Sequence, residues 1–126
     1  MFLNVVEVSM NGNKPRVHKV WSAVHCGRVV NPDGARTQVE GAIAYGLSAA
    51  LYGRIKFDKG RVVTGNFNDY QIARMNEMPT VDVSFVRTED PPTGLGEPGL
   101  PPLAPAIANA VFKLTGKRVR KLPFEV

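Results

Sequence analysis

The N-terminal part of the chain alternates between apolar and polar positions with the two-residue period of β-strands. Valine-rich alternation runs over residues 2–10, and a similar pattern resumes over residues 16–25. Between the two runs, Asn11-Gly12-Asn13 is a turn signal, because asparagine and glycine accept the left-handed backbone conformations of tight hairpins. These two runs therefore predict an antiparallel hairpin.

Two later stretches have the period of buried helices. In the first, four apolar positions recur at helical spacing, namely Val39, Ile43, Leu47 and Leu51. Thr37 and Glu40 fit a capping box, so we predict a helix over residues 37–52 and a turn at residues 31–34 before it. A second apolar helix is predicted over residues 102–115. Because both helices are apolar nearly all round, we expect them to lie inside a larger body.

Shorter patterns complete the fold class. A second hairpin is predicted over residues 54–67, around Asp58-Lys59-Gly60, and single strands over residues 81–86 and 118–122. Residues 68–80 have no clean period and are expected to be ordered but irregular. The sequence therefore predicts an α+β fold of antiparallel strands and hairpins packed with two apolar helices.

Composition and charge limit the class of protein. The 126 residues suit one domain, and no apolar run approaches the roughly 18 residues that a membrane span needs. The single cysteine, Cys26, cannot form an internal disulfide, and we expect it to be a buried apolar residue. The net charge of +5 raises the expectation of an anionic partner. Its densest stretch, residues 117–121, is either a solvated face or a site for a polyanion.

One carboxylate lies in an unusually stiff and bare stretch. The sequence GLGEPGLPP, residues 94–102, places Glu97 among three glycines and three prolines. Gly96 and Gly99 leave the backbone open to a close approach by another group, while Pro98 stiffens the turn. The nearby start of the second helix would favour the ionised form, as a general base requires. The alternative is a solvated turn glutamate.

A second candidate is Gln38, which falls in the first turn of the predicted helix. Free backbone amides there form an anion site, and the side-chain amide offers a donor and an acceptor to a heterocycle. The alternative is an exposed first-turn glutamine. His18 and His25 have no partners at metal-ligand spacing, so a zinc site is not expected, and the sequence has no P-loop or dinucleotide fingerprint.

Three stretches, in order along the chain, carry a resemblance to a known family. They are CGRVVNPDGARTQVEGAIAYGLSAALYG (residues 26–53), NDYQIARMNEMP (residues 68–79) and GLGEPGLPPLAPAIANAVFKLTGKRVRKLPF (residues 94–124). Together they resemble the C-terminal part of the molybdopterin-binding large subunit of the xanthine dehydrogenase and aldehyde oxidase family. The resemblance is closest to the isoquinoline 1-oxidoreductase beta subunit. It implies that residues 1–126 are one C-terminal segment of a larger molybdenum-cofactor-binding fold.

The resemblance also implies a chemistry. Glu97 corresponds to the family's general base in the hydroxylation of an aldehyde or an N-heterocycle with water-derived oxygen, and Gln38 and Gly96 correspond to cofactor-binding positions. The implied cofactor is molybdopterin, expected as the cytosine dinucleotide. The implied partners are the remainder of the molybdopterin-binding subunit, a two-iron two-sulfur alpha subunit and a small-molecule substrate, with no nucleic acid and no membrane span.

Two other functions stay open at this point. The chain is several times shorter than the family's subunit, so we expect it to be inactive and free of molybdenum on its own. It is then a catalytically silent fragment or an assembly module. The remaining alternative is a small basic domain that binds a polyanion through residues 117–121, with affinity that falls steeply as salt rises. The residues name neither the substrate nor the compartment, cytoplasmic or periplasmic.

Overall fold

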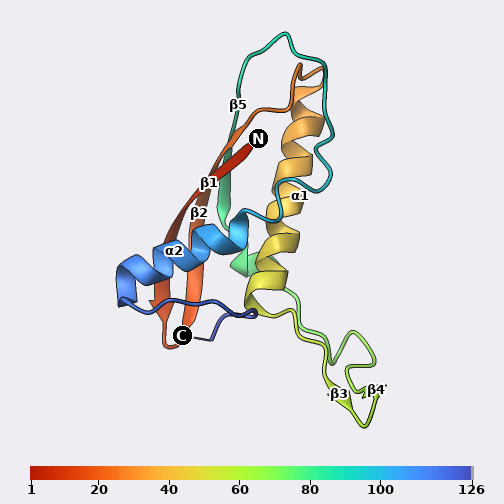
Figure 1. The fold of residues 1–126 in the computed structure, drawn as a ribbon, viewed down its shortest axis with the longest axis vertical. Helices are drawn as coiled ribbons and strands as arrows, with labels where there is room; N and C mark the ends of the chain where they lie inside the picture. Colours follow the sequence, from red (N-terminus) through yellow and green to blue (C-terminus); the bar gives the residue numbers. More distant parts are fainter. Residues whose placement is uncertain (126) are drawn as a thin grey trace.

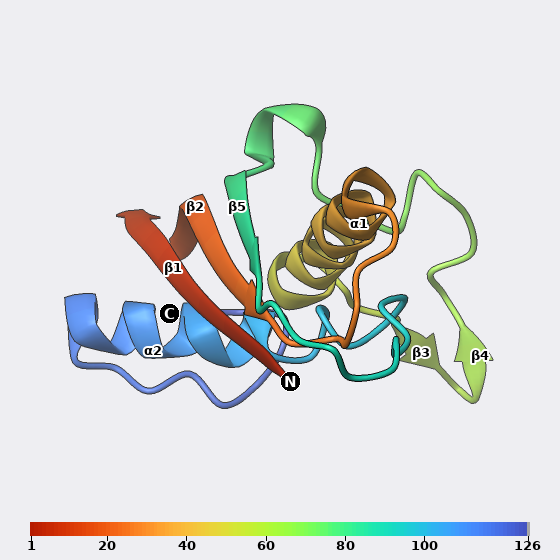
Figure 2. The same cartoon turned by 90° about the horizontal axis from the view of Figure 1, so that it is seen from above.

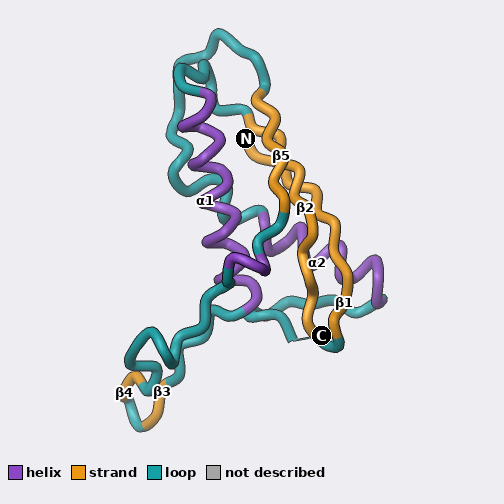
Figure 3. Tube along the Cα trace, turned by 180° about the vertical axis from the view of Figure 1, so that it is seen from behind, coloured by secondary structure: helices purple, strands orange, loops and turns teal. Residues whose placement is uncertain are grey.

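The computed structural model describes residues 1–125 and forms one sheet with two helices packed against it (Figure 1). The sheet has three strands in the order β1-β2-β5, and a separate two-stranded hairpin projects away from the body (Figure 3). The bounds are β1 Phe2–Asn11, β2 Lys14–Val24, α1 Pro32–Leu51, β3 Phe57–Asp58, β4 Arg61–Val62, the 3-10 helix η1 Met75–Glu77, β5 Thr80–Phe85 and α2 Leu103–Thr115. The predicted α+β class is confirmed.

The predicted N-terminal hairpin is confirmed as β1 and β2. The two strands pair antiparallel from Phe2 opposite Val24 to Asn11 opposite Lys14, with a bulge after Glu7. The turn is closed at Gly12, whose φ of 59° lies in the left-handed region that glycine enters without steric cost.

The third strand differs from the expectation that the strands would pair antiparallel. β5 pairs in parallel with β2, from Lys19 opposite Thr80 to Val24 opposite Phe85, so the sheet is mixed. A parallel pair needs a long crossover connection, and α1 lies within the segment that joins β2 to β5. Figure 2 shows α1 beside β5, while α2 runs beneath β1 and β2.

The first helix begins earlier than the capping pattern predicted. It starts at Pro32 with Asn31 as its N-cap, because the Asn31 side-chain oxygen accepts a hydrogen bond from the Gly34 backbone N–H at 3.0 Å. The predicted turn at residues 31–34 and the capping box at Thr37 were therefore wrong. Asparagine followed by proline is also a strong helix start, since proline is favoured in the first helical position. Thr37 instead donates within the helix to the Asp33 carbonyl.

The second helix was predicted nearly to the residue, but the strand after it was wrong. α2 ends at Gly116, whose φ of 72° closes the helix in the left-handed conformation. Residues 117–120 have no regular structure. The Arg118 guanidinium instead lies 3.9 Å from the centre of the Phe112 ring, and the Phe124 backbone N–H donates to the Ala50 carbonyl at the end of α1. The tail is thus held by the two helices and adds no strand to the sheet.

The second predicted hairpin is present but short. Only two residues on each side pair, and the turn between them places Lys59 and Gly60 at φ values of 47° and 78°. Two successive left-handed residues are typical of the hairpin turns that match strand twist. Apart from η1, residues 68–79 are irregular, as predicted.

The core lies between the sheet and the two helices. It combines the inward side chains of β2 with one face of each helix, and its fully buried large members are Val17, Val20, Val24, Val39, Ile43, Leu47, Leu103, Ile107 and Val111. The opposite face of the sheet carries no helix (Figure 2), and Leu3 and Val5 on β1 are more than half exposed there. Cys26 is buried at the edge of the core, as expected.

A hydrogen bond between Tyr52 and Glu77 fastens η1 to the end of α1. The Tyr52 hydroxyl donates to one Glu77 carboxylate oxygen, and the other oxygen accepts from the Arg74 backbone N–H at 2.8 Å. Burial, followed by the neighbouring Glu77, raises the pKa of Tyr52 to about 12, and the Tyr52 hydroxyl together with the Arg74 amide lowers the pKa of Glu77. This contact is formed by neutral tyrosine and ionised glutamate.

The two pKa shifts predict how pH acts on this contact. Since the pKa of Tyr52 is raised on folding, its stabilisation is complete below the unfolded pKa, about 10, and is lost as pH rises through the folded value. Glu77 has a lowered pKa, so its stabilisation is present above the unfolded pKa and is lost as pH falls through the folded one. Tyr52→Phe will therefore remove part of the pH dependence of the unfolding midpoint above pH 10. Tyr45→Phe, at an exposed tyrosine, is the matched control, and identical profiles for the two variants would contradict the assignment.

Candidate functional site

One pocket lies between α1 and the loop that precedes α2. Its volume is about 550 Å³. It brings together all three residues that the sequence singled out: Gln38 from the helix, and Gly96 and Glu97 from the loop. The complete lining is Thr37, Gln38, Gly41, Ala42, Tyr45, Gly96, Glu97, Leu100 and Pro101. Residues that lie far apart in the sequence therefore share one concave surface.

The helical wall differs from the one that the sequence predicted. Because α1 begins at Pro32, Gln38 lies in its second turn, past the free amides of the helix start. The anion site predicted at the Gln38 backbone was therefore wrong. Gln38 is exposed and lines the pocket, so its side-chain amide is free to present both a donor and an acceptor there.

The loop wall is built from consecutive turns. The Leu100 backbone N–H donates to the Glu97 carbonyl at 3.0 Å, and the Leu103 N–H donates to the Leu100 carbonyl at 3.3 Å. These bonds lead from the loop into α2 and fix the backbone at Glu97. The Glu97 side chain is exposed, and its carboxylate makes no ion pair within residues 1–125. The carboxylate is therefore accessible to a group that enters the pocket.

The two glycines beside Glu97 have different roles. A Cβ at Gly99 would lie 3.0 Å from the Ala42 Cβ and 3.4 Å from the Phe2 ring, so Gly99 lets the loop pack directly on α1. The expectation that this side was also clear for another group was wrong. A Cβ at Gly96 would meet nothing within 4 Å, and Gly96 lines the pocket. The open approach is therefore on the Gly96 side alone.

The helices meet at a second glycine contact. Figure 1 shows α1 and α2 crossing steeply. A Cβ at Gly46 of α1 would lie 3.2 Å from Leu103 Cδ2, at the start of α2, and 3.3 Å from the Leu100 carbonyl oxygen. Leu103 is fully buried at the start of α2. This contact joins the helix that carries Gln38 to the start of α2.

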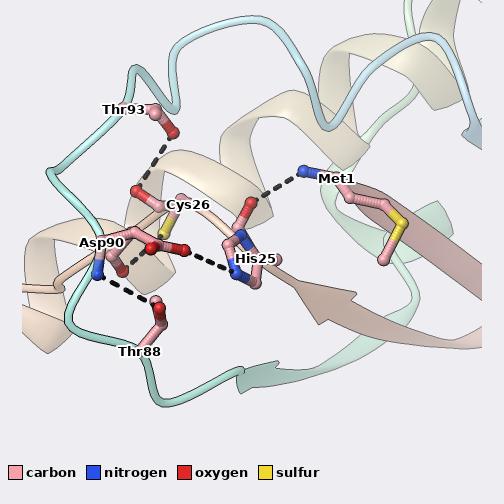
Figure 4. A network of polar contacts seen from close by, with 7 residues as sticks. Met1, His25, Cys26, Thr88, Asp90 and Thr93 are labelled. Atoms are coloured by element: carbon pink, nitrogen blue, oxygen red, sulfur yellow. Dashed lines mark hydrogen bonds and ion pairs between the residues drawn. The ribbon is translucent and has the colours of Figure 1, made fainter.

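A polar network ties the incoming end of the loop to the segment after β2 (Figure 4). Thr93 donates to the Cys26 carbonyl from both its backbone N–H, at 2.8 Å, and its hydroxyl, at 3.0 Å. His25 Nε2 lies 3.3 Å from an Asp90 carboxylate oxygen, and the Arg28 backbone N–H donates to the Asp90 backbone carbonyl at 2.9 Å. His25 is therefore engaged in holding residues 88–93, which lead directly to Glu97.

The pocket has little charge. Glu97 is its only charged lining residue. The basic stretch at residues 117–121 belongs to a different surface, beside Phe112 and the outer side of α2. Among residues 1–125, no group of three or more His, Cys, Asp or Glu side chains is placed to hold a metal ion. In the same part of the chain, no helix is both long and apolar enough to cross a bilayer.

Because Glu97 is the only charged residue in its lining, the pocket suits an uncharged ligand surface rather than a phosphate.

Six of the nine lining residues were not singled out as site residues by the sequence analysis, among them Gly41 and Tyr45. Gly41 and Tyr45 stand three and seven positions after Gln38, and such spacing places residues on one face of a helix. The signal that would have found them is this helical spacing from Gln38.

Comparisons with known proteins found one matching domain family and several relatives. Residues 1–79 match the family described as Molybdopterin cofactor-binding domain. The chain is 40% identical over 118 residues to the isoquinoline 1-oxidoreductase subunit beta of Brevundimonas diminuta, a match that covers 94% of this chain and 15% of that protein. It is also 41% identical over 105 residues to a membrane-bound aldehyde dehydrogenase [pyrroloquinoline-quinone] of Gluconacetobacter polyoxogenes, covering 83% of this chain and 14% of that protein.

A solved structure has the same fold. Quinoline 2-oxidoreductase from Pseudomonas putida 86 superposes with a TM-score of 0.78 at 24% identity, over 86% of this chain and 15% of that one. The chain thus spans about one seventh of the length of the relatives that it matches.

Proposed function

Because this chain belongs to the molybdopterin cofactor-binding domain family, we propose that it forms one wall of the catalytic site of a molybdenum hydroxylase, with Glu97 as general base. The family predicted from the sequence is confirmed, and some of its relatives are named as molybdenum-binding subunits of an aldehyde oxidoreductase or a xanthine dehydrogenase. The observation that carries the proposal is the single pocket shared by Gln38, Gly96 and Glu97. The other walls come from the remainder of the subunit, since the chain spans so little of its relatives.

The lining fits the uncharged part of a molybdopterin cofactor. Gly96 leaves open the space that a Cβ would fill, and the Gln38 amide offers a donor and an acceptor to a polar ring or ligand. The pocket has no arginine or lysine for a phosphate. If the cofactor carries a cytosine dinucleotide, its phosphates are therefore held by residues outside this pocket. Gln38 and Gly96 are the positions that we assign to cofactor contact.

The proposed chemistry needs a base where Glu97 lies. When bound, a molybdenum cofactor supplies a two-electron acceptor. The Glu97 carboxylate accepts the proton of the water-derived oxygen that is transferred to the substrate, an aldehyde or an N-heterocycle. A carboxylate without an ion-pair partner within residues 1–125 is free to take that proton. A small-molecule substrate and an alpha subunit with two-iron two-sulfur clusters, which takes the electrons onward, complete the proposed assembly.

The proposal predicts where the cofactor is found. The chain purified alone will hold no molybdenum, because it provides one wall of the pocket, whereas the subunit assembled with its remaining polypeptide will hold molybdenum and pterin in stoichiometric amounts. Metal analysis and pterin fluorescence measure both. In ¹⁸O-labelled water, the assembled enzyme will place the label in its product. Pyrroloquinoline quinone in place of pterin, as named for one relative, would contradict the cofactor assignment. Stoichiometric molybdenum in the isolated chain would show that the wall suffices alone.

A further inference from the structure

The loop that carries Glu97 is preceded by a very close contact between two backbone segments. A Cβ at Gly27, which follows β2, would lie 2.0 Å from the Pro91 carbonyl oxygen, and the φ of Gly27 is 76°. Only glycine leaves room for this approach and adopts this φ without steric cost. Beside the contact, the Thr93 backbone N–H donates to the Cys26 carbonyl at 2.8 Å (Figure 4). The segment before Glu97 is therefore held against the segment after β2.

Thr93 adds a second donor to the same carbonyl. Its hydroxyl donates to the Cys26 carbonyl oxygen at 3.0 Å, in addition to its backbone N–H. A single hydrogen bond leaves a residue free to turn about that bond, whereas two donors on one acceptor also restrict its orientation. Both partners belong to this chain, so the link does not depend on what the remainder of the subunit covers.

The linked residues precede both walls of the pocket along the chain. After Cys26 the chain runs to Asn31, the N-cap of α1, and this helix carries Gln38. After Thr93 it runs to Glu97. A separate hollow of about 280 Å³ is lined by Cys26, Thr93 and Gln38 together. Because Gln38 also lines the pocket with Glu97, the link lies beside that pocket and ties the start of one wall to the start of the other.

The backbone between Thr93 and Glu97 has little means of holding its own shape. Gly94 and Gly96 are two of its three residues, and a Cβ at either would meet nothing within 4 Å. Leu95 between them packs against the core, which limits how far the loop moves. A side-chain contact between two glycines does not fix the backbone direction on either side, because glycine has wide conformational freedom. The direction in which the loop reaches Glu97 therefore depends on its upstream anchor.

We propose that Thr93 is a positioning residue for the base: its hydroxyl bond to the Cys26 carbonyl sets where the Glu97 carboxylate lies relative to Gln38. The inference rests on the proposed function, because it needs Glu97 to be the base. Thr93 does not line the pocket and takes no part in the chemistry itself. Its effect on turnover arises through the placement of Glu97, since a small displacement of a catalytic group is costly.

The test compares three variants of the assembled enzyme. Thr93→Val keeps the shape of threonine and removes the hydroxyl, and it is expected to fold because the Cys26 carbonyl retains its bond from the backbone N–H. Thr93→Ser restores the hydroxyl. Thr115→Val is the matched control, because the Thr115 hydroxyl also donates to a backbone carbonyl, that of Val111 at 2.9 Å, but at the far end of α2.

The quantities measured are kcat, KM, molybdenum and pterin, with isoquinoline or benzaldehyde as the substrate, whichever the wild type oxidises. We expect Thr93→Val to lower kcat by about tenfold, with KM within about twofold and cofactor content unchanged. Thr93→Ser should recover most of this loss, and Thr115→Val should match the wild type. A purely structural role of the hydroxyl would lower cofactor content or stability and would not single out kcat.

A double substitution tests whether Thr93 acts through Glu97. In a Glu97→Gln background, Thr93→Val should change the rate of cofactor reduction by excess substrate by less than about twofold, because the carboxylate that it positions is already gone. An equal loss with and without the Glu97 carboxylate would overturn the inference. A loss of pterin in Thr93→Val would do the same, since the hydroxyl would then serve assembly.

The remaining outcomes separate this inference from the proposed function. A kcat of Thr93→Val equal to that of Thr115→Val overturns the role of Thr93 and leaves Glu97 as the base. Turnover of Glu97→Gln near the wild-type level overturns the proposed function, and the role of Thr93 with it.

Discussion

Glu97→Gln in the assembled enzyme is expected to lower turnover by about 100- to 10,000-fold while molybdenum and pterin contents stay at the wild-type level. Glutamine keeps the size and shape of glutamate but cannot accept the proton. The turn at Glu97 is held by backbone bonds from Leu100 and Leu103, so the substitution leaves the loop in place. The measurement is steady-state turnover together with cofactor content on the same preparation.

Glu40→Gln is the matched control for this experiment. Glu40 is also exposed and lies on α1, but it does not line the pocket. We expect the turnover of this variant to stay within about twofold of wild type, since surface substitutions away from buried, paired or pocket-lining groups have small effects. Turnover of Glu97→Gln within severalfold of wild type would show that another group is the base. A loss of cofactor together with activity would assign Glu97 to cofactor retention instead.

Leu103→Ala is expected to lower the free energy of unfolding by about 2–5 kcal/mol, because a fully buried leucine leaves a cavity that the structure fills only partly. Leu103 has no exposed surface and lies against Gly46, where α2 meets α1. Chemical denaturation of the purified chain measures the change.

The same helix offers the control for this substitution. Leu114 is 56% exposed near the other end of α2, so Leu114→Ala should change the free energy of unfolding by about 0.5 kcal/mol or less. Equal losses for the two variants would mean that α2 does not pack on α1 through its first turn. The assignment of Leu103 as the contact between the two walls would then be wrong.

Local signals in the sequence predicted the elements that depend on local chemistry. The Asn-Gly turn predicted the first hairpin, and the apolar run before Gly116 predicted α2. The start of α1 was missed because Asn31-Pro32 is a signal both for a turn and for a helix start, and only the rest of the helix decides between them. The parallel pairing of β5 with β2 depends on how a long crossover folds back, which no local pattern encodes.

The site was predictable to a similar degree. Glu97, Gln38 and Gly96 were identified as separate candidates, and their place in one pocket emerged from the packing of the loop on α1. We expected open space at Gly99, but this glycine packs on α1. The prediction failed because the neighbour that Gly99 accommodates, Ala42, is distant in sequence. Their roles as base and cofactor contacts stay predictions until the variants are measured.

The contact at Gly46 has a geometric consequence for the whole site. Since the helix that carries Gln38 and the segment that leads from Glu97 into α2 touch where a side chain is missing, the size of residue 46 sets how closely the two walls approach. Because Gly46 carries a hydrogen where alanine would carry a methyl group, the two segments pack more closely than any larger residue would allow. Packing at Gly46, which does not line the pocket, therefore limits how the Gln38 amide on one wall and the Glu97 carboxylate on the other are positioned relative to each other.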